Sequence, residues 1–274
     1  MRISPVNFTS LPFIQQDSDE LQKALKNHQV IGFDVDTQED FMHIQPQRKG
    51  LYVNGDKGDG AETIIPRLKR IRDIIVDFCI PRIETIDTHK IDDPEFKYFL
   101  DYSDGHCIEG TKGWEKIPET TYPDNNRHAV SLSLEKNDVP RKDFLKKILS
   151  KGGTVTVQKN TYSVFEHAKY YGNPDDLKQS LVENPKFIQT IEKFRELGVK
   201  TALVYGVATD YCVQTAVIWL KKLGIKPIVV QDAVKEVERN GLVDPADPIY
   251  RDVVVMSTDQ LEEELIKSRT PNRI

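Results

Sequence analysis

The sequence predicts a doubly wound α/β protein with a mainly parallel, six-stranded sheet and helices on both faces. Short apolar runs alternate along the chain with longer amphipathic patterns of helical period. The runs are rich in β-branched residues and are apolar on both sides, as expected of central strands in a parallel sheet. A chain of 274 residues with 38% hydrophobic and 30% charged residues is long enough for one large soluble domain.

The strands are predicted at 30–35, 82–86, 154–158, 201–207, 226–231 and 252–256. A helix over 65–78 follows from the common face of Leu68, Ile71, Ile75 and Phe78, and a helix over 185–198 from Phe187, Ile191 and Phe194. A helical pattern also follows Cys212, in "QTAVIWLKKLG". The final helix, 257–268, opens with the capping-box spacing of Ser257 and Gln260, and an amphipathic helix is expected around Leu21 and Leu25.

Residues 1–274 are expected to form a single domain with an N-terminal extension over about 1–27. Residues 116–142 are polar, contain three prolines and are interpreted as an insertion. Residues 47–62 are rich in Gly and Asp and are interpreted as a long loop.

Composition excludes several function classes. A net charge of -5 disfavours a nucleic-acid-binding surface, and no apolar run approaches the roughly 20 residues that span a bilayer. The N-terminus lacks the apolar core of a secretory signal, and three cysteines are an odd number without paired spacing. We therefore expect a cytoplasmic protein with a small-molecule partner and neither nucleic acid nor membrane as partner; the sequence leaves a homo-oligomer open.

Polar residues follow four of the predicted strands. Asp36, Asp87, Lys159 and Cys212 stand at or just beyond the ends of the runs that begin at 30, 82, 154 and 201. Ligands bind outside the carboxyl ends of strands in parallel α/β sheets, so these side chains are expected to meet at one edge.

Cys212 is the candidate nucleophile, because the first turn of a helix favours a thiolate. The alternative, a small buried hydrophobe, is kept for Cys79 and Cys107. Asp36 is a candidate proton carrier and Lys159 a candidate stabiliser of both anions, with a purely structural ion pair as the alternative. Asp34, on the same strand as Asp36, has no explanation in the sequence.

A second candidate constellation is a metal site. Asp87 and His89 share one side of an extended segment, and His106 lies in a Gly-containing turn. One Asp with two His suits Zn²⁺, Fe²⁺ or Mn²⁺ with open positions, and Glu95 is a candidate fourth ligand. A surface Asp with unrelated histidines is the alternative, since Asp-x-His is a common spacing.

These motifs, taken in order, resemble those of the isochorismatase-like cysteine hydrolases, and among them the nicotinamidases. "DTQEDF" looks like the segment that carries the catalytic aspartate, here Asp36, and "DTH" like the metal-binding Asp-x-His. "GHCIEGTKGWE" is similar to the segment of the third ligand, here His106. "QKNTYSVF" matches the catalytic-lysine segment with Lys159, and "GVATDYCV" the nucleophile segment with Cys212.

The resemblance implies an amidohydrolase of NAD metabolism that converts nicotinamide to nicotinate and ammonia. A Cys-Asp-Lys triad and a thioester carry the reaction, and one divalent metal ion binds in the pocket. It further implies a cis peptide at Val207–Ala208, with oxyanion donors at the backbone N–H groups of Ala208 and Cys212. Phe41, Val53 and Tyr211 are expected to line the substrate pocket.

The chain departs from the nicotinamidase pattern at Glu95, Ser103 and Tyr211, where His, Trp and His are common. Two alternatives therefore stay open: a related cysteine amidase acting on another small amide or an N-carbamoyl compound, and a non-catalytic metal-binding member of the family.

Overall fold

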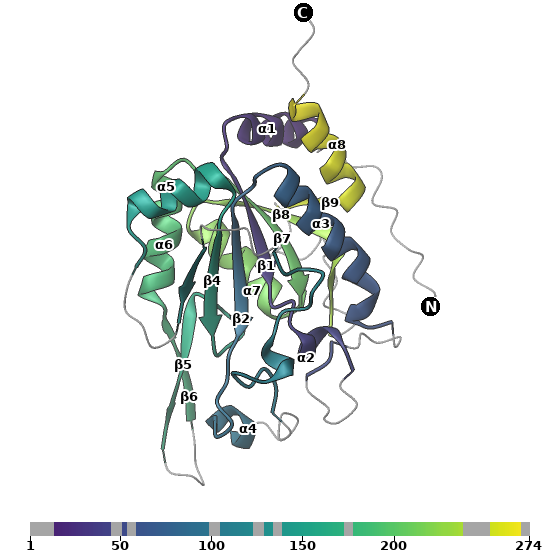
Figure 1. Cartoon of the computed structure of the whole chain (residues 1–274). Coiled ribbons are helices and arrows are strands. Elements are labelled where there is room, and N and C mark those ends of the chain that lie inside the picture. Colours follow the sequence, from purple (N-terminus) through teal and green to yellow (C-terminus); the bar gives the residue numbers. More distant parts are fainter. Residues whose placement is uncertain are drawn as a thin grey trace, which may run out of the picture.

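A seven-stranded parallel sheet forms the centre of the computed structural model (Figure 1). The structure describes residues 14–44, 51–53, 59–98, 105–122, 129–133, 139–172, 178–237 and 253–269. The strand order is β3-β4-β2-β1-β7-β8-β9, and every pairing in this sheet is parallel. The strands are β1 (Val30–Val35), β2 (Arg82–Asp87), β3 (Ala129–Leu132), β4 (Thr154–Lys159), β7 (Thr201–Val207), β8 (Lys226–Lys235) and β9 (Val254–Met256).

Helices cover both faces of the sheet, as a doubly wound fold requires. One face packs against α1 (Ile14–Lys26), α3 (Ile65–Asp77) and α8 (Thr258–Arg269). The other packs against α5 (Lys142–Lys151), α6 (Pro185–Glu196) and α7 (Cys212–Lys222). Short helices α2 (Glu39–Met42) and α4 (Pro94–Tyr98) and the 3₁₀ turns η1 (Ala61–Ile64) and η3 (Lys112–Trp114) lie in connections.

The central strands are apolar because both of their faces are covered. All residues of β1 and β7 are buried, including Phe33 and Val204 on one face and Tyr205 on the other. Gly206 is required where these two strands meet, since its φ is +115° and an added Cβ would lie 2.0 Å from the carbonyl oxygen of Val35. The predicted capping box also forms, with reciprocal bonds between Ser257 and Gln260.

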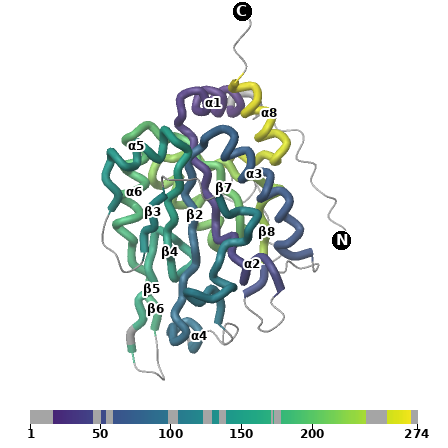
Figure 2. Tube along the Cα trace, in the orientation of Figure 1, coloured from purple at the N-terminus to yellow at the C-terminus, as the bar shows by residue number. Residues whose placement is uncertain are grey.

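The sheet has one strand more than the six predicted. The additional strand, β3, comes from the 116–142 segment that the sequence indicated as an insertion, and it lies beside β4 at the edge of the sheet (Figure 2). A separate antiparallel hairpin of β5 (Glu166–Tyr171) and β6 (Lys178–Glu183) was also not predicted. Its strands are polar and half-exposed, so they lack the apolar run by which the central strands were recognised.

The strand order reverses between β1 and β7. From β1 the chain builds outward through β2 and β4 on one side, whereas β7, β8 and β9 follow on the other. Such a switch point opens a crevice at the carboxyl ends of the strands. In Figure 1, α4 and the β5–β6 hairpin lie at this lower end, whereas α1 and α8 lie at the opposite end.

Within the described part of the chain, none of the helices combines the length and the apolar character needed to cross a lipid bilayer.

Candidate active site

Lys159 lies at the centre of a buried polar cluster. Its Nζ is 2.9 Å from Asp36 Oδ2 and 3.7 Å from Cys212 Sγ. The exposed fractions of these residues are 1% for Lys159, 0% for Asp36 and 9% for Cys212. The structure therefore brings together the carboxylate, ammonium and thiol that the sequence placed at the ends of three different strands.

The backbone at the switch point places each of these groups. Asp36 follows β1 with a φ of +48°, and Thr85 of β2 donates a 2.6 Å hydrogen bond to its Oδ1. Lys159 is the last residue of β4. Cys212 is the first residue of α7, which follows β7 through a cis peptide bond at Val207–Ala208. Three strand ends and one helix start thus converge on one point.

The thiol is favoured over the thiolate at Cys212. Burial raises the pKa of the Cys212 thiol well above its ordinary value, the carboxylates of Asp36 and Asp87 act in the same direction, and Lys159 opposes them. Burial alone would lower the pKa of Lys159, but Asp36, Asp87 and Cys212 outweigh it and raise that pKa. Lys159 therefore favours its ammonium form, and burial opposes the effect of the helix start on the Cys212 thiol, so a base beside the sulfur assists removal of its proton.

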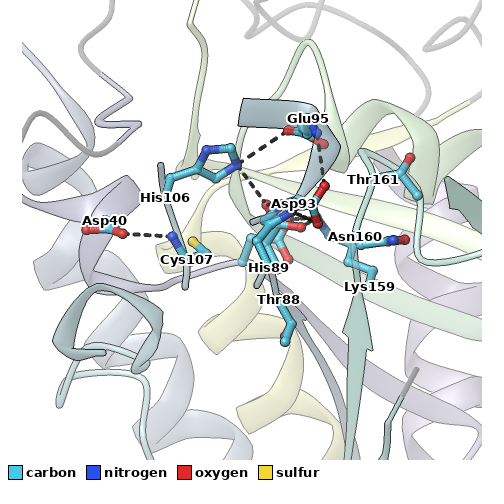
Figure 3. Close-up of polar contacts among 12 residues, drawn as sticks. Asp40, Thr88, His89, Asp93, Glu95, His106, Cys107, Lys159, Asn160 and Thr161 are labelled. Carbon is cyan, nitrogen blue, oxygen red and sulfur yellow. Dashed lines mark hydrogen bonds and ion pairs between the residues drawn. The ribbon is translucent and has the colours of Figure 1, made fainter. Parts of the chain in front are cut away.

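Asp87 links this cluster to the predicted metal ligands. Its Oδ1 is 3.1 Å from Lys159 Nζ, and its Oδ2 is 3.2 Å from His89 Nε2 and 3.4 Å from His106 Nε2. Glu95 comes close as well, with its Oε1 3.7 Å from His106 Nε2 (Figure 3). All four predicted ligands are buried and face one another.

Burial and neighbouring charges together shift the pKa values of these groups. Burial opposes the charged imidazolium of His89, but Asp87, Asp93 and Glu95 outweigh it and raise the pKa of His89 to about 10. Burial raises the pKa of Glu95 to about 7, with Asp87 and Asp93 adding and His89 opposing. Burial lowers the pKa of His106 despite Asp87.

The donor set fits a divalent transition metal ion. One ligand atom each from Asp87, His89 and His106 lies within 4.8 Å of the others, and all three residues are buried. Two imidazole nitrogens and one carboxylate oxygen suit zinc, iron or manganese with open positions for further ligands. Glu95 stands beside this set and can supply a further oxygen.

Two residues whose roles the sequence did not reveal hold the loops of the site in place. Gln38 donates from Nε2 to the carbonyl oxygen of Asp87 (2.8 Å) and accepts at Oε1 from the N–H of Asp87 (2.7 Å). Asp40 Oδ2 accepts a 2.8 Å bond from the N–H of Cys107, next to His106 (Figure 3). Both belong to the "DTQEDF" segment, so its spacing carries the signal, although only the structure shows the partners.

A cavity of about 120 Å³ opens over the sulfur and the metal ligands. The predicted pocket residues Phe41, Val53 and Tyr211 all line it, together with Leu51 and the hairpin residue Leu181. The cavity reaches Cys212, Asp87, His89, Glu95 and His106. It therefore combines apolar walls with a polar end at which the thiol and the metal ligands meet.

Asp34, which the sequence left unexplained, belongs to a second buried cluster. Its Oδ1 is 3.0 Å from Lys116 Nζ and accepts a 2.9 Å hydrogen bond from Thr37, while its Oδ2 is 3.4 Å from Arg82 Nη1. The two charged partners, Lys116 and Arg82, come from segments distant in sequence. No local pattern could have indicated them.

Comparisons with known proteins agree with this architecture. Residues 135–244 match the family model described as the Isochorismatase domain. No curated protein was found to match the chain by sequence.

Solved structures with the same fold include several nicotinamidases. The nicotinamidase/pyrazinamidase from Bacillus subtilis is 18% identical with a TM-score of 0.54, covering 84% of this chain and 100% of its own. The Acinetobacter baumanii nicotinamidase/pyrazinamidase is 22% identical with a TM-score of 0.53, covering 85% and 98%. The pyrazinamidase of Pyrococcus horikoshii, solved in complex with zinc, is 18% identical with a TM-score of 0.51, covering 84% and 99%.

Proposed function

We propose that this chain, which has the fold of the isochorismatase-like hydrolases, is a metal-containing cysteine amidohydrolase acting on nicotinamide. The observation that carries this proposal is the position of Lys159, whose Nζ lies 2.9 Å from the Asp36 carboxylate, 3.7 Å from the Cys212 sulfur and 3.1 Å from Asp87. A nucleophile, a proton carrier and a metal-ligand set thus share one small cavity.

In the first half of the reaction Cys212 attacks the amide carbonyl carbon. The thiol proton passes to Asp36 as the new S–C bond forms, because burial keeps the free thiol protonated. The backbone N–H groups of Ala208 and Cys212 are assigned to the oxyanion, where one such donor is typically worth about 3 kcal/mol. Asp36 then gives its proton to the amide nitrogen, the C–N bond breaks, and ammonia leaves a thioester.

In the second half a water molecule attacks the thioester carbonyl carbon. Asp36 accepts a proton from this water, the C–S bond breaks, and the proton returns to the sulfur of Cys212. The products are a carboxylic acid and the original thiol. Lys159 stays protonated throughout and holds the carboxylate of Asp36 in place.

Asp87, His89 and His106, with Glu95 beside them, would hold the metal ion. When bound, a divalent ion supplies a Lewis acid at the polar end of the cavity and neutralises negative charge there. The apolar walls formed by Phe41, Val53 and Tyr211 suit a flat aromatic ring. Nicotinamide, with a carboxamide on a pyridine ring, presents such a ring together with a nitrogen that can face the metal ligands.

The cellular setting forms part of the proposal. Cys79, Cys107 and Cys212 are all free thiols in the structure. A thiol nucleophile works in a reducing compartment, which is consistent with the cytoplasm.

The test is ammonia release by the zinc-, iron- or manganese-loaded protein from a panel of amides. Nicotinamide, benzamide and several N-carbamoyl amines are compared, each with metal-loaded and chelator-treated protein. We expect nicotinamide to be the best substrate and chelation to reduce its turnover. Benzamide is the matched control, because it has the same shape without the ring nitrogen.

Other outcomes would redirect the proposal. Ammonia from N-carbamoyl amines but not from nicotinamide would identify a carbamoyl amidase. A protein that binds one metal ion per chain and hydrolyses no amide of the panel would be a non-catalytic member of this fold.

A further inference from the structure

We infer that Asp93 is a positioning residue that orients two of the metal ligands, His89 and Glu95, with its two carboxylate oxygens. Oδ2 lies 3.0 Å from His89 Nδ1, and Oδ1 accepts a 3.0 Å hydrogen bond from the N–H of Glu95 (Figure 3). The inference rests on the proposed metal site, but it concerns a residue outside the ligand set.

The contact with His89 decides which ring nitrogen faces the ligand cluster. A carboxylate can only accept, so the hydrogen in the bond to Asp93 is carried by Nδ1 of His89. Nε2 faces the ligand cluster, 3.2 Å from Asp87 Oδ2, and is the nitrogen that would hold the metal ion once its own hydrogen has left. A carboxylate behind a ligating imidazole fixes its tautomer and its orientation in this way.

The contact with Glu95 fixes the short helix α4. Asp93 precedes Pro94, the first residue of the helix, and its side chain caps the N–H of the second. The same helix carries Phe96, whose ring centroid lies 5.3 Å from that of His89 and 5.4 Å from that of His106. The cap therefore holds the carboxylate of Glu95 and the aromatic ring that packs against both imidazoles.

Burial strengthens the contact between Asp93 and His89. The side chain of Asp93 is 11% exposed and that of His89 is 1% exposed, so water competes weakly for their hydrogen bond. Asp92, the preceding residue in "IDDPEF", is exposed. The chain thus offers a matched control, because the same substitution at the neighbouring position removes the same charge.

Three variants separate the two contacts. Asp93→Asn offers one oxygen and one amide group, so it can satisfy either the Glu95 N–H or the Nδ1 hydrogen of His89, but not both. Asp93→Ser keeps a capping oxygen but is too short to reach His89. Asp93→Ala loses both contacts. Asp92→Asn serves as the control.

The measurement is the Zn²⁺ affinity of the folded protein after a chelator has removed its metal. It is determined by competition with a chromogenic chelator. The absorption spectrum of the Co²⁺-loaded protein and the thermal unfolding of the metal-free forms are recorded alongside. We expect a 10- to 100-fold weaker Zn²⁺ affinity in Asp93→Asn and Asp93→Ser and an altered Co²⁺ spectrum. Asp92→Asn should match the wild type, and the metal-free Asp93→Ser should melt between the wild type and Asp93→Ala, because its helix cap remains while the contact with His89 is lost.

Two results would overturn the inference. Wild-type affinity in both Asp93→Asn and Asp93→Ser, with a loss only in Asp93→Ala, would show that Asp93 acts through the helix cap alone. A wild-type protein that binds no Zn²⁺ would overturn the proposed metal site itself and the role of Asp93 with it. The first result leaves the proposed function intact, so the two failures are distinguishable.

Discussion

At the scale of single residues, Lys159 shows how a buried charge is maintained. A lysine with 1% exposure is costly unless it is paired, and here two carboxylates and a sulfur surround its ammonium group. The same contacts place Asp36, Cys212 and Asp87 around one ammonium group. The stability of the site and its chemistry therefore depend on the same contacts.

The proposed proton transfer through Asp36 can be tested without changing the size of the side chain. Asp36→Asn keeps the shape but cannot accept the thiol proton, so we expect kcat for nicotinamide to fall about 10²- to 10⁴-fold with little change in KM. Steady-state ammonia release measures both constants. Asp73→Asn, on the exposed surface of α3, is the control, and an unchanged kcat in Asp36→Asn would remove Asp36 from the mechanism.

Glu84 carries a prediction about pH and stability. Burial raises its pKa, but Arg82, Lys116 and a hydrogen bond from Thr156 outweigh burial and hold the pKa below its ordinary value of 4.5. A group whose pKa is lowered in the folded state stabilises the protein above its unfolded pKa. That stability is lost as the pH falls from about 4.5 through the lower, folded-state pKa.

The variant Glu84→Gln should therefore be less stable at neutral pH, on the order of 3 kcal/mol, because it leaves Arg82 short of one partner in a buried ion cluster. Its free energy of unfolding should also change less than that of the wild type between pH 6 and the acid range. Urea unfolding at several pH values measures both effects. Glu115→Gln, whose side chain is 57% exposed, should change stability by less than about 1 kcal/mol, and parallel pH profiles of Glu84→Gln and wild type would contradict this account.

At the scale of elements, the β5–β6 hairpin is the least expected part of the site. Gln179 and Leu181 of β6 line the cavity, and Gln179 donates a 3.1 Å hydrogen bond to the hydroxyl of Tyr170, which lies 3.4 Å from Glu95. The side chain of Leu181 is an exposed apolar group at the cavity, with a residue exposure of 50%. Burying this apolar side chain against a bound substrate would stabilise the complex.

Replacing Leu181 by Ser tests this role of the hairpin. About half of a leucine side chain is open to burial, worth about 1 kcal/mol, so we expect KM for nicotinamide to rise about fivefold with kcat nearly unchanged. Steady-state kinetics separate the two constants. Ser180→Ala, at the adjacent position outside the cavity lining, is the control; equal KM values in Leu181→Ser and wild type would show that substrate does not reach the hairpin.

The sequence could predict those helices and strands whose apolar patterns are local. The buried strands and the helices α3, α6 and α8 have apolar patterns that depend only on local sequence, and each is found where it was predicted. Strand β3 and the hairpin are polar and depend on tertiary contacts, so their sequences carried no such signal. Cys79, expected to be buried, is exposed in the turn after α3 with a φ of +51°.

The candidate site likewise has a part that the sequence could predict and a part that only the folded structure shows. Strand ends and motif spacing were enough to predict that Asp36, Lys159, Cys212 and the candidate metal ligands would lie close together, because a parallel sheet brings its carboxyl ends together. The partner of Asp34 and the hydrogen bonds of Asp93 were not predictable, because each depends on the exact approach of side chains in the folded chain.

At the scale of the whole molecule, the order of the strands creates the site. Strand β1 lies between β2 and β7, with β2, β4 and β3 on one side of it and the later strands β7, β8 and β9 on the other. The crevice at this reversal collects residues from β1, β2, β4 and the start of α7, which are four separate segments of the chain. Residues from α2, α4 and the hairpin line the cavity at this crevice, and Phe41 of α2 and Leu181 of the hairpin contribute to its apolar walls.

The most direct test of this account compares ammonia release from nicotinamide by metal-loaded Cys212→Ala and wild-type protein, with Cys79→Ala as the matched cysteine control. Wild type and Cys79→Ala are expected to turn over alike, and Cys212→Ala to lose at least about 10⁴-fold in kcat while retaining its metal. Hydrolysis of nicotinamide by Cys212→Ala at a rate near that of the wild type would contradict the account, because no bond to this sulfur would then be needed.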